Sequence, residues 1–359
     1  MRQALDSDLS LILSLAHPRS FERESELRQK GWLVRDWNAV LDRAAALGIG
    51  VPVLSHARAI LRSVMPEEAY ARATIEETRL RAKALEKTLQ VVDLSRRLSA
   101  AGVETIVLKG PSVGISAYGD PSLRPFSDID LLVRHDSVAA ASILLADLGY
   151  RPLYSVTEKA SLVRGGRALE FSGQSVKVEL HTTLMERYLL FSIPEDELWS
   201  QSFVIECGNS TVRVLNRAHE FVFLCAHAAK HEWERVRWAL DLAHLSERLD
   251  ATGIETIASL ARSTHAARIV ALASRVTALL FDGRSFPEPL DSLARALDTR
   301  ACLAMCAKRL TASGREGRFT RVLRSLHPVL QPSYFWIRAR ERSSDRVRVI
   351  LQLSVDALT

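Results

Sequence analysis

The chain has 359 residues, of which 47% are hydrophobic and 25% are charged. This length and composition are typical of a globular protein of two or three domains and exclude a disordered or fibrous chain. No apolar run approaches the roughly 18 residues that a membrane span needs. Asp6 and Asp8 stand where a signal peptide would carry only positive charge. We therefore expect a cytoplasmic protein with no membrane contact.

The net charge of +6 is carried by arginine, which supplies 40 of the 48 basic residues. Guanidinium groups suit phosphate contacts, but an arginine excess can equally reflect genomic base composition. The four cysteines show no CxxC spacing, so neither a zinc knuckle nor a thioredoxin-type motif is predicted. Cys302 and Cys306 lie one helical turn apart, and we expect them to be thiols in a core.

Residues 1–100 have helical periodicity and are assigned to an N-terminal helical domain. Asp36 is placed to cap a helix that Gly48 can end. A long pattern opens with Pro66 and two glutamates and stops at Gly102. It predicts one long helix, or two helices with a kink.

The middle third of the chain changes character after Gly102. Residues 103–108 and 128–133 have the composition of buried strands, and a helix is predicted over 137–148. Further strand candidates lie at 150–155, 167–171, 176–182, 202–206 and 211–215. Strands confined to this third, with helices on both sides, predict an α+β core over residues 101–215. The remainder, 216–359, is assigned to a C-terminal helical domain that opens with a helix over 217–248, capped by Asn216.

A pair of acidic residues on the predicted strand 128–133 carries the candidate chemistry. Side chains two residues apart in a strand point to one face, so Asp128 and Asp130 project together while Ile129 and Leu131 face the core. Neighbouring carboxylates repel each other unless a cation lies between them. The pair therefore predicts a divalent metal site that holds a polyphosphate, although acidic pairs on strands are also common as solvated faces.

The residues before this strand favour the metal site. Lys109 and Gly110 end the preceding strand, and Ser112 begins a predicted helix. A turn of this kind can offer backbone N–H groups to phosphate oxygens, and the helix N-terminus adds partial positive charge.

The h-G-x-S turn followed by D-h-D-h resembles the signature of the polymerase-β-like nucleotidyltransferase superfamily. A larger pattern over about residues 30–250 is similar in particular to a bacterial group described as uncharacterised nucleotidyltransferases. It includes Tyr118, Gly119, Asp120, Arg124 and the run SDIDLLV at 127–133. The chain departs from better-known members in having Pro111 in the turn and a longer gap between turn and strand. The resemblance implies a nucleotidyltransferase core with a mixed sheet and helices.

The superfamily site implies a third carboxylate on a neighbouring strand. In the predicted strand 176–182, Lys177, Glu179 and His181 alternate with apolar residues, and we take Glu179 as this third acid. Two alternatives stay open: Glu179 could lie on the exposed face of an edge strand, and Glu170 could be the third acid instead.

These parts indicate a mechanism with two Mg²⁺ ions. Asp128 and Asp130 would hold both ions. Glu179 would complete the shell of the second ion and accept the proton of the attacking hydroxyl.

The basic and turn residues would bind the nucleotide. Gly110 and Ser112 would hold the β and γ phosphates. Lys109 and Arg124 would neutralise developing charge, unless they are simply surface cations.

Three polar residues on the predicted helix 217–248 form a second group. His227 and His231 are four residues apart, with Lys230 beside them. H-x3-H can ligate zinc, but no third ligand is evident, and a half-buried structural position is common for such histidines. The resemblance favours a lining role, in which all three residues face the phosphate or base of a bound nucleotide.

The tail Gly314–Thr359 carries nine arginines interleaved with aromatic residues. Such a stretch can bind nucleic acid. It can also form amphipathic helices with solvated arginines, which we favour.

We thus expect a magnesium-dependent nucleotidyltransferase that moves a nucleoside monophosphate from an NTP, expected to be ATP, to an acceptor with release of pyrophosphate. The acceptor could be a small molecule, a natural product or a protein. The alternatives are a tRNA-type enzyme acting on nucleic acid and a non-catalytic nucleotide-binding or scaffold protein on the same fold.

Overall fold

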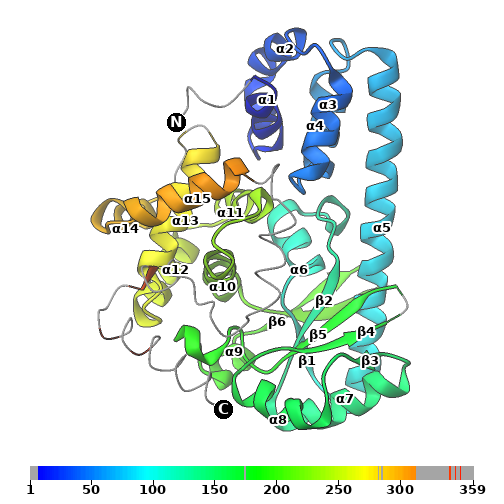
Figure 1. Ribbon diagram of the computed structural model, residues 1–359, viewed down its shortest axis with the longest axis vertical. Helices are drawn as coiled ribbons and strands as arrows, with labels where there is room; N and C mark the ends of the chain where they lie inside the picture. The colour runs from blue at the N-terminus through cyan, green and yellow to red at the C-terminus, as the bar shows by residue number, and fades with distance from the viewer. Residues whose placement is uncertain are drawn as a thin grey trace.

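A computed structural model describes residues 7–173, 175–281, 283 and 286–312, together with residues 339, 340, 344 and 348. The sheet lies beside the lower half of the long helix α5, the N-terminal helices lie above it, and the C-terminal helices flank it (Figure 1). Helices and a mixed sheet together confirm the predicted α+β class. Most of the arginine-rich tail lies outside the described residues.

The N-terminal helices follow the predicted pattern. They are α1 Ser7–Ala16, α2 Glu24–Trp32, α3 Trp37–Ala46, α4 Gly50–Ile60 and α5 Glu67–Ala100. Asp36 caps α3 as predicted, because its carboxylate accepts a hydrogen bond from the backbone N–H of Ala39. The long pattern forms one helix, α5, whose 34 residues span about 51 Å.

Within the described residues, seven strands form one sheet in the order β3-β4-β5-β2-β1-β7-β6. They are β1 Thr105–Val107, β2 Asp128–Val133, β3 Arg151–Pro152, β4 Leu169–Ser172, β5 Lys177–His181, β6 Phe203–Cys207 and β7 Ser210–Val214. Each predicted strand is confirmed. The central strands β2 and β5 are parallel, and β5 also pairs with β4. Glu179 therefore does not lie on an edge strand, and that alternative is wrong.

The remaining helices follow β1 in the chain and contribute residues to the apolar clusters on the two faces of the sheet. They are α6 Pro111–Val113, α7 Val138–Asp147, α8 Val156–Arg164, α9 Glu195–Ser200, α10 Arg217–Lys230, α11 Val236–Ser246, α12 Ala251–Ser263, α13 Ala267–Leu280, α14 Leu290–Ala296 and α15 Arg300–Ala312. Asn216 caps α10 as predicted. Cys302 and Cys306 are buried thiols in α15. None of the described helices is long and apolar enough to cross a membrane.

The prediction of one helix over 217–248 is wrong. The chain leaves helical geometry between α10 and α11, where Glu232 and Trp233 adopt φ angles of 54° and 58°. The side chain of Trp233 is completely buried. Burial of this large indole compensates the cost of a left-handed backbone and separates the two helices.

The sheet divides the apolar residues into two clusters. Ile106 and Leu132 belong to a cluster that contains residues of α1–α4 and α10–α13. Val107 and Leu131 belong to a cluster on the opposite face, with residues of α5 and α7. Helices from both ends of the chain thus share one apolar cluster. The division into domains at residues 100 and 215 stays a prediction.

Candidate active site

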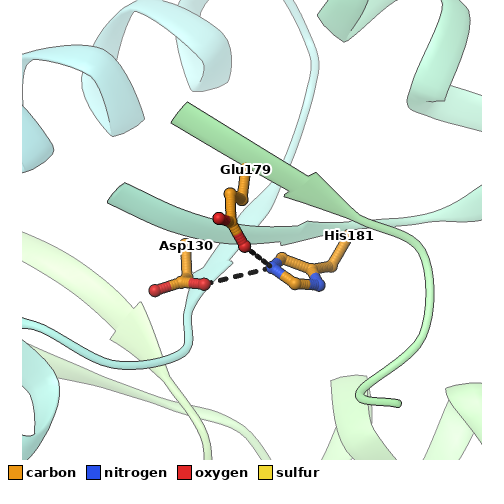
Figure 2. A group of neighbouring side chains, drawn as sticks. All are labelled: Asp130, Glu179 and His181. Carbon is orange, nitrogen blue, oxygen red and sulfur yellow. Dashed lines mark hydrogen bonds and ion pairs between the residues drawn. The ribbon is translucent and has the colours of Figure 1, made fainter. Parts of the chain in front are cut away.

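The parallel register of β2 and β5 brings acidic residues together. Asp130 lies opposite Glu179 in this register. The ligand atoms of Asp130, Glu179 and His181 lie within 4.8 Å of one another, and Figure 2 shows the three side chains converging from the two strands. His181 Nε2 lies 3.1 Å from Asp130 Oδ1 and 3.6 Å from Glu179 Oε2. Of the His, Cys, Asp and Glu residues that the structure describes, these three form the group that could hold a metal ion.

Two lysines contact the carboxylates of this group. Lys109 Nζ lies 2.9 Å from Asp130 Oδ1, and Lys177 Nζ lies 2.5 Å from Glu179 Oε1. Burial by itself would raise the pKa of Asp130, but the charge of Lys109 and the hydrogen bond from His181 outweigh it and hold that pKa below its ordinary value. Asp130 is therefore an ionised carboxylate that attracts cations.

The other two acidic candidates lie at the margin of the group. Asp128, half-buried at the start of β2, accepts a hydrogen bond from Ser127 Oγ. Glu170 lies directly opposite Glu179 on β4, and its side chain is 49% exposed. Lys177 Nζ lies 3.4 Å from Glu170 Oε2. Neither acid belongs to the metal group, so a ligand role for Asp128 stays a prediction.

A cavity of about 480 Å³ lies over these residues, within the size range of small-molecule sites. Side chains of α10 and of the segment that begins α11 also line this cavity. Of the predicted site residues, it is lined by Lys109, Gly110, Arg124, Asp128, Asp130, Glu179, His227, Lys230 and His231. The fold therefore brings all predicted site residues except Ser112 to one cleft.

Ser112 lies behind the cleft, in the core. It is 1% exposed, and its Oγ donates a hydrogen bond to Glu220 Oε1 at 2.5 Å. Ser116 Oγ donates to the other oxygen of Glu220 at 2.6 Å. Burial raises the pKa of the Glu220 carboxyl, although both serines oppose this shift. The Ser112 hydroxyl is thus engaged with Glu220, and its contact with phosphate stays a prediction.

Gly110 shapes the turn that leads to Ser112. Its φ of 58° with ψ of −119° is a conformation that L side chains rarely adopt. A Cβ at this position would also lie 3.2 Å from the ring of Phe126. Gly110 therefore allows the chain to turn beside the loop that enters β2.

Arg124 forms a buried ion pair. Its Nε and Nη2 donate to the carboxylate of Asp241 at 2.9–3.0 Å, and Tyr118 Oη donates to the same carboxylate. Arg124 is 4% exposed and Asp241 is 1% exposed. The interpretation of Arg124 as a surface cation is therefore wrong. The Arg124–Asp241 pair connects the loop before β2 to α11. A phosphate contact by Arg124 stays a prediction.

The α10 residues form an aromatic and basic wall. His227 and Lys230 lie in α10, and His231 is its C-cap residue. The rings of His227 and His231 lie 4.8 Å apart, and each lies within 5.5 Å of the Trp238 ring. Lys230 Nζ lies 2.5 Å from Glu186 Oε1. Burial, reinforced by the charge of Lys109, holds the pKa of His227 well below its ordinary value, so this imidazole is neutral.

Sequence reasoning missed several residues of this cleft. His181 could have been found, because the alternation of residues 177–181 places it on the face of Glu179. Glu186 and Arg237 also line the cleft. No local pattern distinguishes them from surface residues, since their position depends on how distant segments pack.

Comparison with known proteins agrees with this geometry. Residues 34–282 match the model of a protein family described as uncharacterised nucleotidyltransferase. The match includes the whole sheet and the helices α10 and α11 that line the cleft. No protein with a curated description matches the chain. Because the matched segment is well over half of its length, the chain belongs to this family of nucleotidyltransferases.

Proposed function

We propose that the protein is a divalent-metal-dependent enzyme that transfers a nucleoside monophosphate from an NTP to an acceptor and releases pyrophosphate. The reaction class follows from the family. The observation that carries the proposal is the convergence of Asp130, Glu179 and His181 at one wall of a cleft that also contains cationic side chains.

The residues fit a divalent cation. Carboxylate oxygens are the ligands that Mg²⁺ and Mn²⁺ favour, and the ligand atoms of Asp130 and Glu179 lie within 4.8 Å of each other. We propose Asp128, Asp130 and Glu179 as the ligands. Bound there, two Mg²⁺ ions would polarise phosphoryl oxygens and acidify the acceptor hydroxyl.

The side chains of the cleft have separate tasks in this proposal. His181 holds the carboxylate of Asp130 through its hydrogen bond. Lys109, which contacts Asp130 and lines the cleft, would donate to a phosphoryl oxygen. Glu179 accepts the proton of the attacking hydroxyl. The rings of His227 and Trp238 offer a surface against which the base of the nucleotide, expected to be ATP, can pack.

Titration calorimetry of each NTP with and without Mg²⁺ tests this function. Asp130→Asn removes one charge at nearly constant shape and should abolish Mg²⁺-dependent binding. Asp136→Asn is the matched control, because Asp136 is exposed and does not line the cleft. If Asp130→Asn binds MgATP as tightly as the wild type, the site assignment is wrong.

A further inference from the structure

The basic side chains of the cleft divide into those that contact a carboxylate and those that do not. Lys109, Arg124 and Lys230 each contact a carboxylate, namely Asp130, Asp241 and Glu186. Arg167, Arg235 and Arg237 also line the cleft, but no carboxylate oxygen of the described residues lies within 4.0 Å of their side-chain nitrogens. The residues that line the cleft include six basic and six acidic side chains, so the lining is balanced in formal charge. The distribution is uneven, however, because two of these three arginines, Arg235 and Arg237, are neighbours on one element.

These two arginines lie at the N-terminus of α11. Arg235 is the N-cap residue, and Arg237 is the second residue of the helix. A helix N-terminus carries partial positive charge and favours acidic side chains, yet the first turn of α11 contains none and no side chain caps it. Two guanidinium groups thus add to the charge of the helix terminus instead of compensating it.

Arg237 is the more buried of the two arginines. Burial, followed by the positive charge of Arg124, lowers the pKa of Arg237 to about 10. Its Nη1 donates to the carbonyl oxygen of Pro125 at 2.8 Å, while its buried Nε has no hydrogen-bond partner among the described residues. Pro125 stands three residues before Asp128. This contact places Arg237 beside the loop that enters the metal-binding strand.

We propose that Arg235 and Arg237, at the first turn of α11, bind the phosphoryl oxygens of a ligand in the cleft. Guanidinium groups match phosphoryl oxygens with paired hydrogen bonds, and such a ligand would supply the negative charge that this helix terminus lacks. The Ser112 hydroxyl, expected to bind phosphate, donates to Glu220 instead. The proposal rests on the proposed function. The phosphoryl group belongs either to the terminal phosphates of the NTP or to a phosphorylated acceptor.

Calorimetry with inorganic tripolyphosphate, inorganic phosphate and ATP tests the site, with EDTA present so that metal-mediated binding is excluded. Arg237→Gln should weaken tripolyphosphate binding about tenfold or more, the loss typical of hydrogen bonds to a charged partner. Arg237→Lys should retain part of the affinity. Arg96→Gln is the control, because it removes the same charge from an α5 side chain that is 64% exposed.

The two possible sources of the phosphoryl group, the NTP and a phosphorylated acceptor, predict different effects of Arg237→Gln on the three affinities. If Arg237→Gln weakens ATP binding as much as tripolyphosphate binding, the NTP supplies the phosphoryl group. If it weakens binding of inorganic phosphate but not of ATP, the acceptor supplies it. Arg235→Gln is a second variant at an exposed position, and thermal melts establish that each variant is folded.

Unchanged affinity for all three ligands in both Arg237→Gln and Arg235→Gln overturns the proposal. That result leaves the proposed function intact if Asp130→Asn still loses Mg²⁺-dependent NTP binding. Conversely, if the wild type transfers no nucleotide but its tripolyphosphate binding depends on Arg237, the proposed function fails while the anion site stands.

Discussion

Replacing Asp130 by asparagine tests both the electrostatics and the chemistry of the site. The side chain of Asp130 is 2% exposed, and that of Lys109 is 15% exposed. Asparagine keeps the shape of aspartate but removes its charge, so Lys109 and His181 lose the anion that they contact. The substitution therefore acts on stability before any ligand is added.

The expected loss of stability follows from this burial. Breaking a buried ion pair by removing one partner typically costs about 3–5 kcal/mol. The lower end, about 3 kcal/mol, applies here because Lys109 retains access to water. For a chain of 359 residues that unfolds as one unit, an unfolding entropy of roughly 2.1 cal/mol/K per residue converts this loss to a Tm lower by about 4 °C.

Thermal melts with and without MgATP measure both effects. Asp130→Asn is expected to melt lower than the wild type without ligand and to lose the increase in Tm that MgATP produces. Asp136→Asn should behave as the wild type in both melts. An Asp130→Asn variant with an unchanged Tm and an unchanged MgATP shift would refute the reasoning about both the ion pair and the metal site.

The remaining predictions concern other parts of the cleft and its support. Glu179→Gln should retain NTP binding and lose transfer by about 10²-fold or more, as is typical for a positioned base; if Glu170→Gln shows this pattern instead, the choice of third acid is wrong. Arg124→Ala should lower the free energy of unfolding by about 3–5 kcal/mol in denaturant titrations, because it leaves the buried carboxylate of Asp241 without its counter-ion. An unchanged denaturation midpoint would contradict the buried ion pair. Lys230→Ala should lower the Tm, because Lys230 compensates a carboxylate, and should weaken NTP binding by about 1–3 kcal/mol, because Lys230 lines the cleft. An unchanged affinity for NTP would exclude the lining role. Burial lowers the pKa of His244 from 6.5 to about 3, so between these pH values the unfolded state binds a proton that the folded state does not, and the free energy of unfolding should decrease as the pH is lowered below 6.5. His244→Gln should reduce the dependence of Tm on pH in melts between pH 6.5 and 4, and an equal dependence in the variant and the wild type would contradict this prediction.

Local patterns in the sequence predict the sheet and its acidic face well. The run 128–133 forms β2 with the predicted bounds, since alternation of acidic and apolar residues directly reflects the two faces of a strand. The same alternation in 177–181 identifies Glu179 and would have identified His181. These predictions succeed because each depends on residues only two positions apart.

The partners of the turn and loop residues depend on distant segments. Ser112 contacts Glu220, 108 residues away, and Arg124 contacts Asp241, 117 residues away. No spacing within the turn indicates that these side chains pair with α10 and α11 instead of a ligand. Long-range packing decides which polar groups remain available to a substrate.

The break between α10 and α11 has the same origin. Helical periodicity continues through 231–235, but Glu232 and Trp233 adopt a left-handed backbone there, and the side chain of Trp233 is buried. The break creates the N-terminus of α11 with its two arginines. A continuous helix would have placed these residues differently and offered no such terminus.

The most direct test of the central claim is to follow a ³²P label placed in either the α or the γ phosphate of ATP. The protein would be incubated with Mg²⁺, cell extract as a source of acceptors, and either α-³²P-labelled or γ-³²P-labelled ATP. We predict that the α label moves to an acceptor and that the γ label is released as pyrophosphate, in both cases only with intact Asp130. Transfer of the γ label to the acceptor, or transfer that Asp130→Asn supports as well as the wild type, would contradict nucleotidyl transfer at this site.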